Sequence, residues 1–212
     1  MFEDRKLCII GSGGFARETL LVAKAILDRK GLNYLEEVIF LTKDSEYTED
    51  LIMGIKQIKD SDFDPSKFKA VVAISNSSIR RRIVNQLPVN TEFCNLVHPL
   101  ADISDDVDMG VGNIITSGVI ITCNVMIGNH CQFNLQTTVG HDNCISDYVT
   151  TAPSVNISGN CKLEEGVYFG TGAMVREGLS IIKDTLVGMG AVVVKSIGVK
   201  GTYIGNPAKL LS

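Results

Sequence analysis

One repeat constrains the fold of this chain more than any other feature: from Ile103 to Val193 an apolar residue recurs at every sixth position. The period of six fits neither an α-helix at 3.6 residues per turn nor a heptad at 3.5. It is a multiple of the two-residue repeat of a β-strand, so it predicts short strands that each place one side chain inward. Thr151 is the one exception among these positions, which are Ile103, Met109, Ile115, Ile121, Ile127, Phe133, Val139, Ile145, Thr151, Ile157, Leu163, Phe169, Val175, Ile181, Val187 and Val193.

A second feature of the repeat concerns the residue four positions after each apolar one, which is usually small or β-branched, as at Val125, Cys131 and Val167. Three hexads closing one triangular coil place each residue beneath the residue eighteen positions later. This is the signature of a parallel β-helix built from hexapeptide repeats. An irregular β-sandwich is a weaker alternative, because the register is unbroken over the whole stretch.

The N-terminal segment follows a different pattern, which is typical of a mononucleotide-binding βαβ unit. An apolar run at 6–10 predicts a strand, a glycine-rich turn follows at 11–16, and 17–29 has broadly helical spacing that Gly31 ends. Glycines let a backbone approach a phosphate, and the N-terminus of a helix offers free N–H groups. The alternative, a glycine turn that only packs helix on strand, stays open.

Three later runs complete the predicted organisation. The segments 36–42, 69–74 and 93–97 are each expected to form a strand. We therefore expect a small α/β domain with a mostly parallel sheet over 1–97. A β-helix domain is expected over 98–199, and a C-terminal tail rich in glycine and proline over 200–212.

The glycine turn matches the dinucleotide fingerprint in its Ala-ending form, Gly11-x-Gly13-x-x-Ala16. A NAD site also needs an acidic residue at the end of the second strand. That strand ends at Thr42-Lys43, and the domain is about half the size of a full dinucleotide fold. A single nucleotide or a nucleotide sugar is therefore a better expectation than hydride transfer.

Composition excludes several classes of partner. The formal net charge is −4 and no basic stripe is present, which argues against nucleic acid. No apolar run has the length of a membrane span, and the first residues lack the plan of a signal peptide.

None of the six cysteines forms a C-x-x-C pair, so buried thiols in a reducing cytoplasm are expected. A zinc site using Cys144 and His141 is not favoured, and we expect no metal.

The three histidines differ in their neighbours. His98 lies at the expected domain junction, and His130 is expected to be solvated at a hexad corner. His141 alone adjoins a carboxylate, Asp142. A carboxylate favours the protonated ring, which makes the neutral imidazole a better general base. A purely structural histidine at a corner is the alternative.

Three segments together resemble one family: Cys8 to Glu18 (CIIGSGGFARE), Phe133 to Asp147 (FNLQTTVGHDNCISD) and Tyr203 to Lys209 (YIGNPAK). The chain is similar to the sugar O-/N-acyltransferase family, which includes sialic acid O-acetyltransferases and bacterial nucleotide-sugar N-acetyltransferases. The resemblance extends over essentially the whole chain. It implies a left-handed β-helix, a homotrimer, and acetyl-CoA bound in a groove between neighbouring subunits.

The resemblance also implies a reaction and its residues. His141 corresponds to the base that takes the proton of the sugar amine as it attacks the thioester, Asp142 to the adjacent acid and Asn134 to a polar position near the reacting groups. The implied reaction is acetylation of the 4-amino group of a nucleotide-linked amino-dideoxy sugar. Implied substrate-binding residues are Gly13, Gly14, Phe15, Ala16 and Asn76, and implied coenzyme-binding residues are Thr150, Gly159, Thr171 and Met189.

Two positions depart from the family pattern. Thr42-Lys43 stands where relatives often carry two aspartates, which leaves the nucleotide open. Thr150 stands where relatives often have a second histidine, and its hydroxyl is expected to contact the coenzyme. O-acetylation of a sugar such as sialic acid remains the nearest rival. A β-helix carbonic anhydrase and a trimeric binding protein without activity are more distant ones.

Overall fold

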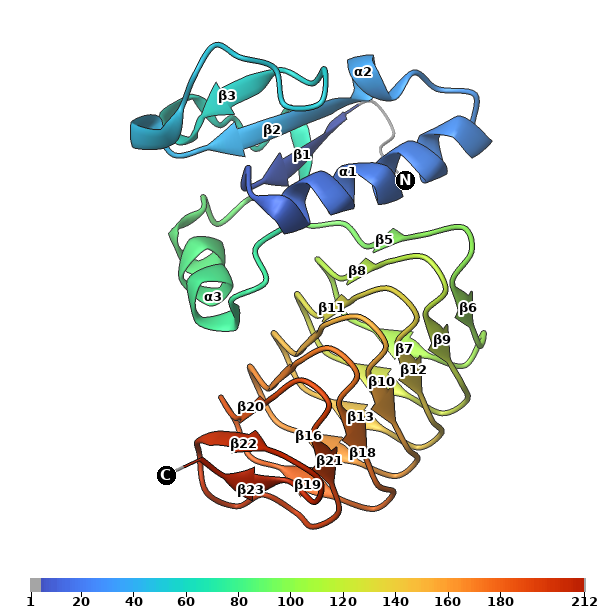
Figure 1. Cartoon of the computed structure of the whole chain (residues 1–212). Helices are drawn as coiled ribbons and strands as arrows, with labels where there is room; N and C mark the ends of the chain where they lie inside the picture. Colours follow the sequence, from blue (N-terminus) through green and yellow to red (C-terminus); the bar gives the residue numbers. More distant parts are fainter. Residues whose placement is uncertain (1–4, 212) are drawn as a thin grey trace.

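The computed structural model describes residues 5–211, and it places an α/β half above a β-helix half (Figure 1). The α/β half has one four-stranded parallel sheet in the order β3-β2-β1-β4. Its strands are β1 (Lys6–Ile10), β2 (Val38–Thr42), β3 (Gln57–Lys59) and β4 (Phe68–Val72). Its helices are α1 (Gly14–Arg29), α2 (Tyr34–Glu37) and α3 (Ser77–Gln86), with short 3₁₀ turns at Asp44–Glu46 and Asp60–Asp62.

The burial of β1 agrees with its central position in the sheet. In the central strand β1 every residue from Leu7 to Ile10 is buried, as expected for a parallel strand covered on both faces. One face packs against α1 through residues such as Leu20 and Leu27. Because all four strands are parallel, their carboxyl ends and the turn before α1 lie along one edge of the sheet.

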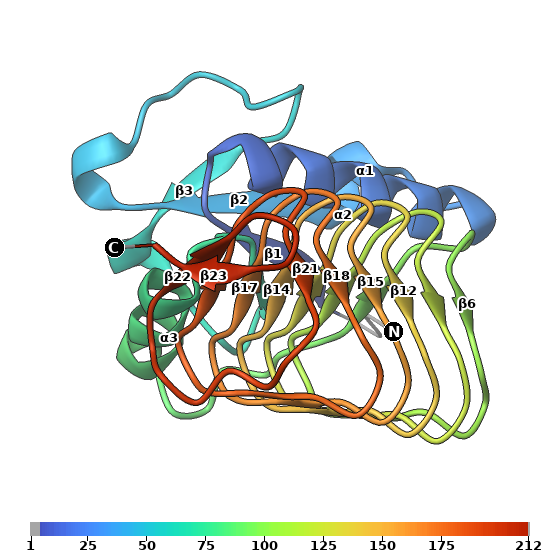
Figure 2. The same ribbon diagram turned by 60° about the horizontal axis from the view of Figure 1, so that its bottom comes forward.

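The β-helix half consists of three sheets of mainly parallel strands that wrap around one core (Figure 2). The eight-stranded sheet holds β5 (Leu96–Val97), β8 (Ile114–Ile115), β11 (Gln132–Phe133), β14 (Thr150–Thr151), β17 (Tyr168–Phe169), β20 (Leu186–Val187), β22 (Thr202–Ile204) and β23 (Lys209–Leu210). The six-stranded sheet holds β6 (Asp102–Ile103), β9 (Ile120–Ile121), β12 (Thr138–Val139), β15 (Asn156–Ile157), β18 (Met174–Val175) and β21 (Val192–Val193). The five-stranded sheet holds β7 (Asp108–Met109), β10 (Met126–Ile127), β13 (Cys144–Ile145), β16 (Lys162–Leu163) and β19 (Ser180–Ile181).

The strand register confirms the stacking predicted from the hexads. Phe133 pairs with Ile115 on one side and with Thr151 on the other, eighteen residues away in each direction. The architecture is that of the expected left-handed β-helix. Thr151 faces the core like its apolar counterparts, and its hydroxyl lies 2.9 Å from that of Thr137. The two threonines satisfy each other inside the coil.

Three edges join the three sheets. The Asn134 edge, with residues 134–137 in its middle coil, joins the eight- and six-stranded sheets. The His141 edge, with residues 140–143, joins the six- and five-stranded sheets. The covered edge, with residues 146–149, joins the five- and eight-stranded sheets.

Two strand predictions need correction. The expected fourth strand at 93–97 contributes β5 to the β-helix, and only Phe93 bridges to Ala70 of the α/β sheet. The fourth strand of that sheet is β3, which the sequence hides because it is short and polar at both ends. The tail also continues the fold, since β22 pairs in parallel with β20 although the hexads have ended.

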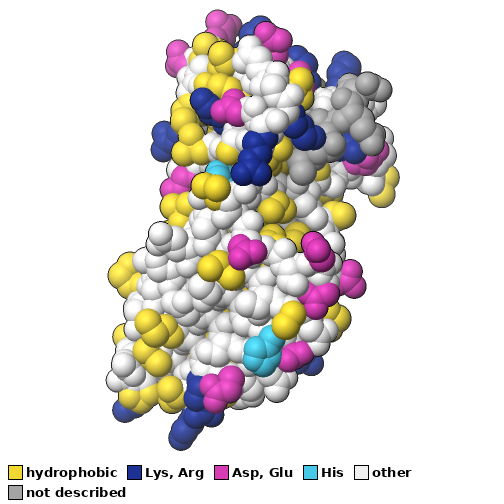
Figure 3. Space-filling model, turned by 90° about the vertical axis from the view of Figure 1, so that its right-hand side faces the viewer, with side chains coloured by type: hydrophobic (Ala, Val, Ile, Leu, Met, Phe, Trp, Pro, Cys, Tyr) yellow, Lys and Arg dark blue, Asp and Glu magenta, His cyan; other side chains and the backbone are white. Residues whose placement is uncertain are grey.

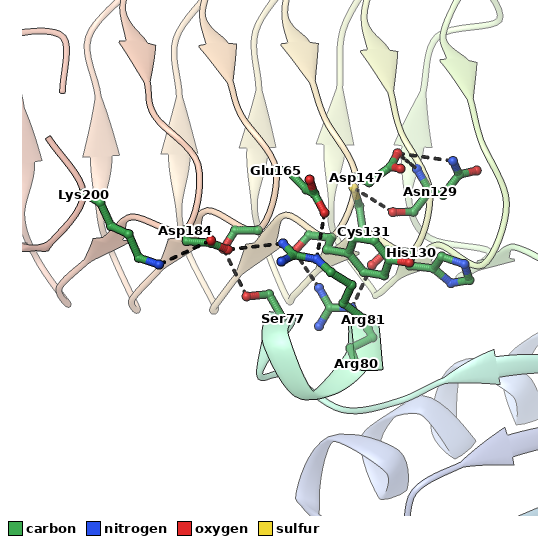
Figure 4. Close-up of polar contacts among 12 residues, drawn as sticks. Ser77, Arg80, Arg81, Asn129, His130, Cys131, Asp147, Glu165, Asp184 and Lys200 are labelled. Carbon is green, nitrogen blue, oxygen red and sulfur yellow. Dashed lines mark hydrogen bonds and ion pairs between the residues drawn. The ribbon is translucent and has the colours of Figure 1, made fainter. Parts of the chain in front are cut away.

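A buried arginine of α3 joins the two halves (Figure 4). The guanidinium of Arg80 is fully buried and has no carboxylate partner in the described chain, and burial lowers its pKa to about 10. Beside it, Arg81 pairs with Glu165 at 2.7 Å and with Asp184 at 3.2 Å. The Arg80 donors reach backbone oxygens of Ile74, Ser75, His130 and Tyr148 and the side chains of Gln132 and Thr150, at 2.6–3.2 Å.

The position of His130 contradicts the expectation of a solvated corner. Its ring is buried at the covered edge, 4.6 Å from the ring of Phe93 and 5.3 Å from that of Tyr148. Burial, with the charge of Arg80 as a smaller cause, lowers the pKa of His130 to about 4. The prediction was wrong because the α/β half covers this edge, which the repeat pattern alone does not reveal.

Candidate active site

The α/β half contains a pocket of about 550 Å³ at the carboxyl ends of its strands. The turn from Gly11 to Phe15 forms one wall, the end of β2 at Thr42 and Lys43 a second, and α3 with the preceding Ser75 a third. In open parallel sheets this is the edge at which ligands bind. The pocket is therefore the expected place for a nucleotide.

The glycine turn leaves free space in front of α1. Gly11 has φ +117°, and a Cβ there would lie 3.2 Å from the backbone oxygen of Ala73. A Cβ at Gly13 or Gly14, by contrast, would meet no atom within 4 Å. No side chain caps the helix N-terminus at Gly13, so its amides remain available to an anion.

The predicted substrate residues are not equivalent. Gly13, Gly14 and Phe15 line the pocket, as expected of the turn. Ala16 is fully buried in the core beside the sheet and lies behind the pocket wall. Asn76 does not line the pocket: its Oδ1 accepts from the N–H of Ile79 at 3.0 Å and caps α3. Asn76 instead borders a second cavity of about 440 Å³ between α3 and the coils.

The rim of the pocket carries three charged side chains, of which the sequence analysis named only Lys43. Lys43, Glu46 and Asp60 all line it, and the Lys43 Nζ lies 3.7 Å from Glu46. The Oδ1 of Asp60 accepts from the backbone N–H of Asp44 at 2.9 Å, which fixes its orientation. These groups offer both hydrogen-bond donors and acceptors to a ligand.

On the β-helix, His141 and Asp142 form a dyad on the His141 edge. The Nδ1 of His141 lies 2.6 Å from Oδ2 of Asp142, and the imidazole side chain is 61% exposed. The other carboxylate oxygen of Asp142 accepts from the side-chain amide of Asn124, one coil earlier. Hydrogen bonds from His141 and then from Asn124 lower the pKa of Asp142. The face of the β-helix in Figure 3 carries an exposed histidine beside acidic side chains.

Gly159 lies directly beneath the ring of His141. A Cβ at this position would come within 2.7 Å of Nε2 and Cε1 of the imidazole. Glycine therefore leaves room for the ring, and Nε2 is held over the backbone of the next coil. The N–H of Gly159 forms no hydrogen bond within residues 5–211.

The remaining predicted residues do not join this dyad in one chain. Asn134, Thr171 and Met189 all lie on the Asn134 edge, and the side chain of Met189 is widely exposed. The Oδ1 of Asn134 accepts from the N–H of Leu135 at 2.8 Å. The six-stranded sheet separates this edge from His141, and six extended residues span about 20 Å.

The sequence analysis expects the hydroxyl of Thr150 to contact the coenzyme, but this residue does not lie on the open surface of the chain. It is buried against the α/β half, where its hydroxyl accepts from Arg80 at 2.8 Å and donates to the backbone oxygen of Ser75 at 3.2 Å. The physical reason is that β14 belongs to the sheet that α3 covers. Thr150 therefore helps to join the two halves.

The pocket and the dyad also lie on different sides of the molecule. Arg80, Arg81 and Gln132 fasten the α/β half to the eight-stranded sheet and the covered edge. The His141 edge is the one edge of the triangular coil that does not border the eight-stranded sheet. One chain therefore separates its pocket from its own histidine.

Two features are absent from residues 5–211. No group of three or more His, Cys, Asp or Glu side chains is arranged to hold a metal ion in this part of the chain. None of its helices is long and apolar enough to cross a bilayer.

Comparison with known proteins agrees with this geometry. Residues 6–87 match the family model described as the PglD N-terminal domain. The chain is 31% identical over 176 residues to the GDP-perosamine N-acetyltransferase of Escherichia coli O157:H7, covering 81% of this chain and 78% of the relative.

Solved structures resemble nearly the whole chain. The acetyltransferase domain of PglB from Neisseria gonorrhoeae FA1090 in complex with acetyl coenzyme A gives a TM-score of 0.89 at 28% identity, over 98% of this chain and 100% of that one. PerB from Caulobacter crescentus in complex with CoA and GDP-perosamine gives 0.84 at 26% identity, over 98% and 97%.

A nucleotide-type pocket on a parallel sheet, joined to a hexapeptide β-helix with an exposed His–Asp dyad, defines the class of hexapeptide-repeat acyltransferases. The chain belongs within that class to the sugar acyltransferase family of the PglD and GDP-perosamine N-acetyltransferase type. It is accordingly an acyltransferase enzyme.

Proposed function

We propose that this protein transfers the acetyl group of acetyl-CoA to the 4-amino group of a nucleotide-linked amino-dideoxy sugar. The observation that carries the proposal is the dyad, in which Asp142 holds Nδ1 of His141 and leaves Nε2 over the open backbone of Gly159. The family membership and the coenzyme complexes of the relatives support the same reaction.

In the proposed mechanism His141 is the general base. The sugar amine attacks the thioester carbonyl, a C–N bond forms, and Nε2 of His141 takes the amine proton. Collapse of the intermediate breaks the C–S bond, and protonated His141 gives its proton to the departing thiolate of CoA. The acid-base step contributes about 10²- to 10⁴-fold, and fixing amine and thioester together contributes the rest.

Two neighbours assist the base. Asp142 accepts from Nδ1, which fixes the tautomer and stabilises the imidazolium as it forms. The unpaired N–H of Gly159 lies beside the ring and is proposed to donate to the thioester oxygen as negative charge develops. Neither step requires a metal ion.

A shared site follows from the separation of pocket and dyad. We propose a homotrimer in which the pocket of one chain faces the His141 edge of a neighbour, and acetyl-CoA lies between edges of different chains. Asn134, Thr171 and Met189 on one edge would then meet His141, Asp142 and Gly159 on another. This arrangement brings together two sets of predicted residues that a single coil keeps apart by about 20 Å.

The proposed division of labour follows the predicted domains. Residues 1–97 bind the nucleotide sugar, 98–199 carry catalysis, and 200–212 close the coil. A cytoplasmic location is part of the proposal, because buried Cys8, Cys131 and Cys161 remain free thiols.

We propose a guanine nucleotide as the carrier. Guanine presents two adjacent donors, N1–H and N2–H, which a carboxylate such as Glu46 or Asp60 can accept together, and an O6 acceptor that suits Lys43. Uracil and thymine present one donor between two acceptors, which a carboxylate repels. Two relatives named or solved with GDP-perosamine support the same choice.

The test is release of free CoA thiol from acetyl-CoA by the purified protein. The acceptors are GDP-, UDP- and dTDP-linked 4-amino-4,6-dideoxy sugars, with free and CMP-linked sialic acid alongside. Turnover of the GDP-linked amino sugar above all others is expected. Turnover of a UDP- or dTDP-linked sugar alone would overturn the guanine assignment, and turnover of sialic acid alone would overturn N-acetylation.

A further inference from the structure

A ladder of polar side chains runs along the His141 edge beneath the dyad. Asp106, Asn124, Asp142 and Asn160 follow one another at eighteen-residue intervals, each one coil after the last. The Oδ2 of Asp106 accepts from the backbone N–H of Asn124 at 2.9 Å, and Ser104 donates to its Oδ1 at 2.6 Å. The side-chain amide of Asn124 then donates to Oδ1 of Asp142.

This ladder places the two oxygens of Asp142 in different roles. One accepts from Asn124 and the other from Nδ1 of His141. A carboxylate held by two donors has one rotamer, so the ring it holds also has one orientation and one tautomer. An exposed dyad without such support would sample several arrangements, because water competes for each hydrogen bond.

We propose that Asn124 is a positioning residue for the proposed acetyl transfer, which acts by orienting the Asp142 carboxylate against His141. This inference rests on the proposed function only for its kinetic readout. It adds a residue that acts through the Asp142 carboxylate, and it assigns a purpose to the coil that precedes the catalytic one.

A purely conformational reason for Asn124 is the alternative, and the backbone defines how to test it. Asn124 has φ +57°, in the left-handed region where Asn, Asp and Gly are tolerated best. Asn160, one coil beyond Asp142, has φ +58° and is exposed on the same edge. Its side chain makes no hydrogen bond within the described chain, so Asn160 is a matched control with the same backbone demand.

The variants follow from this comparison. Asn124→Asp keeps the shape and removes the donor, and it places a second negative charge against Asp142. Asn124→Gly removes the side chain and still accepts the left-handed backbone. Asn160→Asp and Asn160→Gly repeat both changes at a side chain that makes no hydrogen bond to the dyad, and both keep the backbone N–H through which Asn160 donates to the backbone oxygen of His141. Thermal unfolding and nucleotide binding establish that each variant is folded.

Steady-state kinetics give the first readout. We expect kcat to fall about tenfold or more, equivalent to 1.4 kcal/mol, in both Asn124 variants, with little change in KM for either substrate. The acid limb of the pH–rate profile should move to higher pH in Asn124→Asp. Both Asn160 variants should stay within about twofold of wild type. Equal losses at the two positions, or an unchanged Asn124→Asp profile, would overturn the proposal.

A spectroscopic readout keeps the test independent of turnover. The chain has three histidines, so long-range ¹H–¹⁵N spectra of the imidazoles can be assigned with His141→Asn. We expect a single Nδ1–H tautomer for His141 near neutral pH in wild type and in Asn160→Asp. Tautomer mixing in Asn124→Gly is the predicted result, and an unchanged spectrum there would contradict the proposal. Failure of wild-type turnover would instead count against the proposed function alone.

Discussion

The pocket of the α/β half and the dyad of the β-helix half are two kinds of site on one chain. The pocket is a recess of about 550 Å³ whose walls come from the glycine turn, β2 and α3. The dyad stands on a convex edge, with the His141 side chain 61% exposed. The first surface is a recess within one chain, whereas the second is open, and the proposed homotrimer would supply the other wall of a groove around it.

The two folds explain this difference. A parallel sheet with helices at its strand ends leaves a crevice there, so a recess arises within one chain. A β-helix coil has flat faces and narrow edges, and a groove arises only when a neighbour packs beside it. The comparison predicts that changes at the edge affect chemistry, while changes at the pocket affect binding.

The largest expected effect is a loss of kcat at the His141 edge, with no loss of binding at the pocket. Replacing His141 with alanine should lower kcat by about 10²- to 10⁴-fold, the usual range for loss of a general base. GDP binding measured by calorimetry should be unchanged, because the pocket lies elsewhere on the chain. A kcat near the wild-type value would remove the general-base role from His141.

The join between the two regions can be broken at Arg80. Arg80→Met leaves buried acceptors such as the Tyr148 carbonyl without a donor, and the expected loss of stability is about 3 kcal/mol or more. Urea unfolding provides the measurement. Arg82→Met on the exposed face of α3 is the matched control and should change stability by no more than about 0.5 kcal/mol. Similar losses for both variants would mean that the join contributes little.

At the pocket, Gly13→Trp should block the nucleotide and leave the fold intact. A Cβ at Gly13 meets no atom within 4 Å, so the side chain can occupy the open space in front of α1. We expect affinity for GDP to fall about 100-fold, equivalent to 2.7 kcal/mol. Gly198→Trp, at an exposed glycine that also has free space, is the control. Unchanged GDP affinity in Gly13→Trp would place the nucleotide elsewhere.

The covered edge predicts a smaller, pH-dependent effect. Because the pKa of buried His130 is lowered to about 4, the unfolded chain binds a proton below about pH 6.5 that the folded chain does not. Stability should therefore fall as pH falls from 6.5 towards 4, by about 2 kcal/mol at pH 5. His130→Asn cannot titrate and suits the φ of +54° at this position. Its stability should decline less between pH 7 and 5, and an equal decline would show that His130 does not contribute.

Much of the architecture was predictable because the six-residue repeat keeps one register from Ile103 to Val193 without an insertion. Each apolar residue from Ile115 to Val193 faces the core, and eighteen-residue stacking fixes which residues are neighbours. The same arithmetic could have located two features that were missed. Asn124 lies eighteen residues before Asp142, and Asn134 lies seven residues before His141, which places it on another edge.

The remaining errors share one cause. Repeat arithmetic does not say which face of the coil the α/β half covers, and Thr150 and His130 both lie on that face. Both residues accept a hydrogen bond from Arg80, which lies 50 residues from His130 and 70 residues from Thr150 in sequence. Contacts of this kind carry no local signal in the sequence.

The central claim is that the pocket of one chain works with the His141 of another. Its most direct test is to refold His141→Ala and Gly13→Trp chains together and measure acetyl transfer at a substrate concentration below KM. In a 1:1 random mixture about a quarter of the shared sites would combine an intact pocket with an intact histidine. Recovery near that level, with each variant almost inactive alone, is the predicted result. Activity no higher than the mean of the two separate variants, in trimers shown to contain both chains, would contradict the shared site.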